Sequence, residues 1–108
     1  MAIPHAKSGD VMDVRPLGPV LAKTKTTTLV KSDRLEVIRL IVPANKEISS
    51  HRAKGDVTIQ CLEGSVGILV NGGTQVLDAG RLMYLPPGEL HAVRAIVDTS
   101  LLVTIVLH

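Results

Sequence analysis

Short runs of apolar residues, each closed by a turn signal, follow one another along most of the chain. Branched and aliphatic side chains dominate these runs, and such residues favour β-strands. Residues 66–70 run into Asn71-Gly72, and an Asn-Gly pair between apolar runs is the strongest short-range signal for a β-hairpin. The pattern predicts about eight strands, at residues 26–30, 35–42, 57–62, 66–70, 74–77, 82–85, 90–97 and 101–107. Because no window of helical length has a 3.6-residue period, we expect an all-β sandwich or barrel.

The N-terminal residues differ from the rest of the chain. Residues 1–16 contain Pro4, Gly9 and Pro16 among mixed polar residues, which predicts an arm rather than a core element. The whole chain has 108 residues, the size of one domain. We therefore expect residues 17–108 to form a single barrel.

The last apolar run, at residues 101–107, is apolar at nearly every position. A strand that is apolar on both faces is buried on both faces. One face would meet the barrel interior, and the other a second subunit or the N-terminal arm. A homodimer is the expected assembly.

Composition excludes several classes of function. The chain has no Phe or Trp, one Tyr, a net charge of +2 and basic residues that are spread along it, so nucleic-acid binding is not expected. The longest apolar runs are too short to span a bilayer, and the first ten residues lack the apolar stretch of a signal peptide. Cys61 is the only cysteine, so no intrachain disulfide can form. We expect a cytoplasmic protein.

Two segments carry a resemblance to a known family. Residues 80–91 contain a glycine, five residues, Pro86-x-Gly88, two residues and His91. Residues 51–64 begin with His51 and end with the turn glycine Gly64. They resemble the second and first motifs of the cupins, and the chain is similar to a small single-domain bacterial member of the RmlC-like cupin superfamily. The resemblance implies a double-stranded β-helix, or jelly-roll barrel, with His51 and His91 in its pocket.

The first motif departs from the family pattern. In the resemblance, its second histidine falls on Ala53 and its acid or glutamine on Val57. Metal-binding cupins typically use three histidines and an acid, and this chain keeps only His51 and His91 of the four. A divalent metal (Fe, Mn, Ni, Zn or Cu) would need a third ligand, for which Asp56, Glu89 and Cys61 are the candidates.

A metal-free pocket is the other interpretation. Histidine titrates near neutral pH and can act as a general acid or base, so His51 and His91 are catalytic candidates. Metal-free epimerases of the family pair a histidine base with a phenol, and Tyr84 is the only phenol here. By strand alternation, the predicted pocket is lined by Val57, Ile59 and Cys61, together with Tyr84.

Three functions follow from these observations. The first is a barrel that binds a small molecule through His51 and His91, without established catalysis. The second is a metal-dependent cupin enzyme of the dioxygenase, isomerase or decarboxylase type with a reduced ligand set. The third is a non-catalytic dimeric module for structure or interaction.

Overall fold

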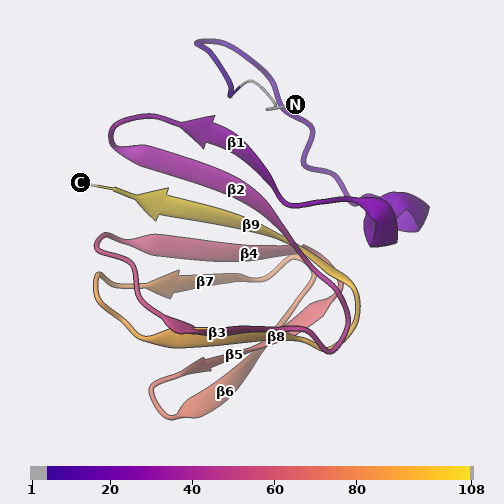
Figure 1. Ribbon diagram of the computed structural model, residues 1–108, viewed down its shortest axis with the longest axis vertical. Coiled ribbons are helices and arrows are strands. Elements are labelled where there is room, and N and C mark those ends of the chain that lie inside the picture. The colour runs from indigo at the N-terminus through magenta and orange to yellow at the C-terminus, as the bar shows by residue number, and fades with distance from the viewer. Residues whose placement is uncertain (1–4, 108) are drawn as a thin grey trace.

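The computed structural model describes residues 5–107, which form two antiparallel β-sheets with one short 3-10 helix (Figure 1). The elements in chain order are η1 (Gly18–Lys23), β1 (Thr27–Lys31), β2 (Leu35–Val42), β3 (Glu47–His51), β4 (Val57–Glu63), β5 (Ser65–Val70), β6 (Gly73–Asp78), β7 (Leu82–Leu85), β8 (His91–Ala95) and β9 (Thr99–Val106). Sheet A has the strand order β1-β2-β9-β4-β7, and sheet B has the order β3-β8-β5-β6. The predicted all-β jelly-roll barrel is confirmed.

Eight of these strands correspond to the eight predicted runs, with ends that differ by at most two residues. The ninth, β3, was not predicted, because Ile48 is the only apolar residue of Glu47-Ile-Ser-Ser-His51. Its two neighbours along the chain, β2 and β4, both belong to sheet A, whereas β3 is an edge strand of sheet B. Tertiary pairing with β8 rather than local pattern therefore forms this strand.

Two turns take the conformations that their residues predict. Asn71 and Gly72 have φ angles of 54° and 76° and join β5 to β6. Gly64 has a φ angle of 94°, and a Cβ atom there would lie 2.4 Å from the carbonyl oxygen of Asp98. A glycine is therefore required where β4 turns into β5.

The core lies between the two sheets and consists of aliphatic side chains. Val66, Ile68 and Leu101 are fully buried, and Cys61 packs among them as a small apolar residue. Because the chain has one tyrosine and no Phe or Trp, aliphatic side chains make up this core.

The segment before β1 lies outside the two sheets (Figure 1). Two charged side chains, Arg39 and Glu63, tie it to sheet A. The buried guanidinium of Arg39 donates to the carbonyl oxygens of Asp13 and Arg15 and to Oγ of Ser100. The carboxylate of Glu63 accepts hydrogen bonds of 2.8 Å from the backbone N–H groups that begin η1. Residues 1–4 of the predicted arm and residue 108 of the predicted barrel lie outside the described part of the chain.

Strand β9 occupies the centre of sheet A, between β2 and β4. Leu101 points into the core, and on the outer face Ser100 is buried under Arg39. Leu102, Thr104 and Val106 of the outer face are half-buried. None of the helical segments among residues 5–107 has the length and apolar character to cross a membrane.

Candidate functional site

A cavity of about 200 Å³ lies between the two sheets, where β2, β9 and β4 face β3 and β8. Eight of its lining residues are aliphatic, and the other two are the histidines that the sequence singled out. The lining consists of Ile38, Leu40, Ile48, His51, Ile59, His91, Val93, Leu101, Val103 and Ile105. The only polar side chains that residues 5–107 contribute to this wall are therefore two imidazoles.

A β-bulge directs His51 into the cavity. Strand β3 pairs with β8 through Ile48↔Val93 and then through His51↔His91, so three steps on β3 match two on β8. In a regular strand, alternation from the inward-facing Ile48 would send His51 to the outer face. The extra residue reverses this direction, as bulges often do next to functional sites. His91 needs no such device, because it lies two residues from the inward-facing Val93.

The two imidazole rings lie against each other. Their centroids are 4.3 Å apart and their planes are tilted by 56°. His91 is buried, with 4% of its surface exposed, whereas His51 is exposed. His51 thus stands at the solvent side of the cavity and His91 at its interior side.

Each histidine is oriented by a backbone carbonyl two residues earlier. Nδ1 of His51 lies 2.9 Å from the carbonyl oxygen of Ser49, and Nδ1 of His91 lies 3.0 Å from that of Glu89. A carbonyl oxygen can only accept, so Nδ1 must carry the proton in both contacts. In the neutral ring, Nε2 is then left with a free lone pair, which can accept a hydrogen bond or bind a metal.

The two positions at which the chain departs from the cupin pattern are apolar and packed. Val57 is 4% exposed and belongs to the core cluster, where it pairs with Leu85 and Ile105. Ala53 is partly buried against the same cluster. Neither position therefore supplies a polar side chain beside the two histidines.

Tyr84 is absent from the cavity, so its predicted place in the pocket is wrong. It pairs with Thr58, one position away from the inward-facing Val57, and therefore lies on the outer face of sheet A. There its side chain is 59% exposed and its hydroxyl donates a 2.6 Å hydrogen bond to Oδ1 of Asp56. This bond raises the pKa of Tyr84, because the phenol proton is held by a carboxylate.

Of the other predicted pocket residues, only Ile59 lines the cavity. Val57 and Cys61 point inward as alternation predicts, but they pack into the core away from the cavity. The Cys61 thiol donates to the carbonyl oxygens of Glu63 and Gly64, and burial raises its pKa. Strand alternation thus predicted correctly that Val57 and Cys61 point inward. It did not predict where along the barrel the cavity lies.

The candidate third metal ligands do not join the histidines. The carboxylate of Asp56 is engaged by Tyr84 on the outer face of sheet A. Cys61 is buried in the core, and Glu89 contacts His91 through its backbone carbonyl. Within residues 5–107, no group of three His, Cys, Asp or Glu side chains is placed to hold a metal ion. The donor set around His51 and His91 is thus short of the three protein ligands usual for zinc or non-haem iron.

Most of the cavity wall was not predicted from the sequence. It comes from the inner faces of β2 and β9, through Ile38, Leu40, Val103 and Ile105. Their apolar pattern predicts burial but cannot distinguish a packed core position from a cavity lining. That distinction depends on the spacing of the two sheets, which no local sequence signal records.

Solved structures with the same fold cover between 74% and 100% of the chain. A conserved protein of unknown function from Streptococcus pyogenes has a TM-score of 0.77 and 22% sequence identity, over 100% of this chain and 96% of that chain. A cupin superfamily protein from Desulfitobacterium hafniense has a TM-score of 0.78 and 18% identity, over 95% of this chain and 100% of that chain. The salicylate 1,2-dioxygenase of Pseudoaminobacter salicylatoxidans has a TM-score of 0.69 and 18% identity, over 74% of this chain but 25% of that chain. At such identities these similarities establish the cupin fold alone.

Sequence comparison gives the family. No curated protein sequence matches the chain significantly. The family model of the AraC-like ligand-binding domain matches residues 43–106, which include both histidines and seven of the nine strands. The chain is therefore a small cupin that belongs to the AraC-like ligand-binding domain family.

Proposed function

We propose that the chain binds a small, mostly apolar organic molecule in the cavity between the sheets, through Nε2 of His51 and His91. The observation that carries the proposal is the pair of Nδ1–carbonyl contacts, which leaves an acceptor nitrogen on each ring. An acceptor pair in an aliphatic wall favours a ligand that brings its own hydrogen-bond donor, such as a phenol or an alcohol.

The volume of the cavity limits the size of this ligand. An apolar cavity of about 150 Å³ is known to hold benzene. The cavity here has about 200 Å³ and accommodates a single ring with one or two small substituents. The family's ligand-binding description agrees with a binding role, and no turnover is required by the geometry.

The metal-dependent alternative has less support in this chain. The dioxygenase among the structural neighbours makes a metal plausible for the fold, but the residues described here do not complete a ligand set. Ala53 and Val57 stand where the cupin pattern has two polar ligands, so these two ligands are missing from this chain. We therefore place no chemical step on a metal.

The first experiment compares 4-methylphenol with toluene, which has the same ring and methyl group but no hydroxyl. We expect 4-methylphenol to bind about fivefold more tightly, because one satisfied hydrogen bond contributes about 1 kcal/mol. Binding is measured by titration with NMR of the Ile, Leu and Val methyl groups, which report directly on the cavity wall.

Variants identify the groups that recognise the hydroxyl. In His51→Ala or His91→Ala, toluene should still bind while the preference for 4-methylphenol is lost. His5→Ala is the control, because this exposed histidine lies far from the cavity in the N-terminal segment. Equal binding of the two probes to the wild type would contradict the proposal. Metal that copurifies stoichiometrically and disappears in both histidine variants would favour the metal-dependent alternative.

A further inference from the structure

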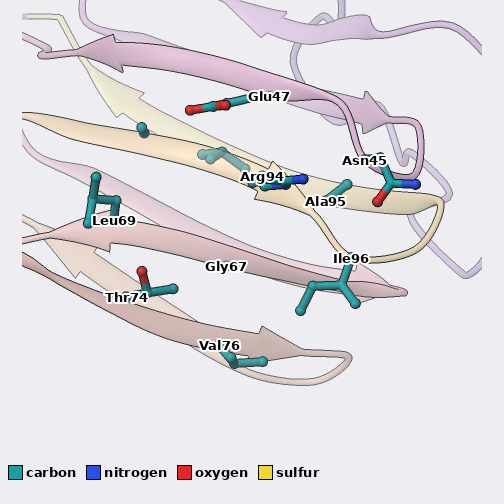
Figure 2. Close-up of a pocket in the computed structure, with 11 residues that line it drawn as sticks. Asn45, Glu47, Gly67, Leu69, Thr74, Val76, Arg94, Ala95 and Ile96 are labelled. Carbon is teal, nitrogen blue, oxygen red and sulfur yellow. The ribbon is translucent and has the colours of Figure 1, made fainter.

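A second hollow lies on the outer face of sheet B, on the opposite side of this sheet from the histidine cavity (Figure 2). It has a volume of about 420 Å³ and opens to solvent. Strands β3, β8, β5 and β6 all contribute to it. None of its residues is among the candidate site residues of the sequence analysis.

The hollow exists because two neighbouring outward positions carry almost no side chain. Gly67 of β5 pairs with Arg94 of β8, and the next outward pair is Leu69 with Ala92. Gly67 has no side chain and Ala92 only a methyl group, so together they form a floor between larger neighbours. Figure 2 shows Leu69 and Ile96 at opposite ends of this floor and Thr74 and Val76 along one side.

The rim of the hollow is unusually apolar for a solvent-facing surface. Leu69, Val76 and Ile96 are 47%, 52% and 51% exposed. Each comes from a different segment, yet all three surround one depression. Clustered exposed aliphatic side chains around a concave floor are typical of a binding surface rather than of a random surface position.

One cation stands at this apolar site. Arg94 is exposed, and no ion pair joins it to an acidic side chain of residues 5–107. Its cross-strand neighbour Glu47 is also exposed, but in Figure 2 the two charged groups extend in opposite directions along their strands. The guanidinium therefore keeps its donors for a ligand, and its planar fork matches a carboxylate.

We propose that this hollow is a second ligand site, which takes a small monocarboxylate with an apolar tail. The carboxylate pairs with Arg94, and the tail lies over Gly67 and Ala92 between Leu69, Val76 and Ile96. Glu47 sets the charge limit, because a second negative group on the ligand would be repelled by its carboxylate. The site is independent of His51 and His91, which face the other side of sheet B.

The test uses 3-phenylpropanoate as the probe and the amide NMR spectrum of the full chain as the readout. We expect saturable shifts at Gly67, Leu69, Ala92 and Arg94. Arg94→Gln should weaken binding at least about tenfold, since it removes a charge-assisted pair. Arg34→Gln, at an exposed position in the turn between β1 and β2, should leave the affinity unchanged.

A second variant tests the shape of the site. In Gly67→Val the new side chain fills the floor, with its Cβ 3.1 Å from the Thr74 methyl group, and should abolish binding while the strand is retained. The His51→Ala/His91→Ala double variant should bind 3-phenylpropanoate as the wild type does, which separates this site from the histidine cavity.

Three outcomes would overturn the proposal. The first is equal binding of the neutral 3-phenylpropanamide, which would mean that Arg94 recognises nothing. The second is shifts confined to the histidine cavity. The third is a dimer that dissociates in Leu69→Lys or Arg94→Gln, which would show that a second copy of the chain covers this face.

Discussion

At the scale of the residue, the sequence indicates where His51 and His91 lie but not which hydrogen bonds they make. The glycine, proline and second glycine that precede His91 fix its turn, so its place in the barrel follows from the sequence; Gly88 indeed has a φ angle of 79°. The family resemblance also implied that His51 and His91 share a pocket, although their pairing across β3 and β8 was not predicted. The hydrogen bonds to the carbonyl oxygens of Ser49 and Glu89, which decide the chemistry of both rings, leave no trace in the sequence, because any residue has a carbonyl.

For Tyr84 and Arg39, the type of side chain alone does not predict the role of the residue. Tyr84 was the only phenol and so the natural partner for a histidine base, but its position in β7 places it on the outer face. Arg39 lies in an apolar run, and no role was predicted for it. It is nevertheless buried and donates hydrogen bonds to the N-terminal segment. In both cases strand register, rather than the chemistry of the side chain, decides the role.

Cys61 gives a prediction about alkaline pH. Burial raises its pKa above the ordinary value of 9.0. The unfolded thiol therefore ionises first, so the contribution of Cys61 to stability is complete below pH 9 and is lost as the pH rises above it. We expect the free energy of unfolding of the wild type to fall more steeply between pH 8.5 and 10.5 than that of Cys61→Val, with both measured by urea denaturation.

The comparison isolates the thiol, because Tyr84, whose pKa is also raised, is present in both proteins. Parallel pH curves would show that Cys61 is not protected from ionisation by the fold. As a control, the thiol should react slowly with a disulfide reagent in the native state and rapidly in urea.

At the scale of the element, β3 has the weakest strand signal in the sequence, yet its bulge directs His51 into the cavity. Its single apolar residue gave no strand prediction, whereas the long aliphatic runs of β2, β4 and β9 were located nearly to the residue. Edge strands with one apolar position depend on their partner for pairing. The bulge within β3 was equally hidden, since Ser49 and Ser50 carry no bulge signature.

The bulge can be tested by changing the length of β3. Deletion of Ser50 leaves His51 two positions after Ile48, on the inner face of a regular strand opposite His91. Insertion of one serine after Ser50 leaves His51 four positions after Ile48, so a regular strand would carry it past the position opposite His91. We expect nuclear Overhauser contacts between the two imidazole rings in the wild type and the deletion variant, and none in the insertion variant.

Folding of each variant is verified first by dispersion of the core methyl signals. Ring contacts that persist in a folded insertion variant would show that the placement of His51 opposite His91 does not depend on the residue count of β3.

At the scale of the whole molecule, the outer face of sheet A bears on the assembly. Leu102 and Val106 of β9 are half-buried there, and Leu82 and Tyr84 of β7 are 63% and 59% exposed. The N-terminal segment covers this face at Ser100, through Arg39. The homodimer expected from the sequence remains a prediction, and this apolar face is the surface that it would use.

Light scattering during size-exclusion chromatography measures the assembly directly. We expect a mass of about twice the 11.5 kDa of one chain. Leu102→Lys should reduce it to the monomer value, because a lysine in an apolar interface must be desolvated. Leu69→Lys, on the outer face of sheet B, is the matched control and should leave the mass unchanged. A wild-type mass of one chain would contradict the prediction.

The central position of β9 in sheet A also bears on when the barrel can be completed during synthesis of the chain. Strand β2 pairs with β1 on one edge and β4 pairs with β7, and for their other edges both strands depend on residues 99–106. While a ribosome is still producing the chain, β2 and β4 expose unpaired aliphatic edges, and the cavity between the sheets has no wall on that side. Such distant pairings make folding slow, and open edges invite aggregation. We therefore expect the cavity between the sheets to close late, when the strand at residues 99–106 inserts between β2 and β4.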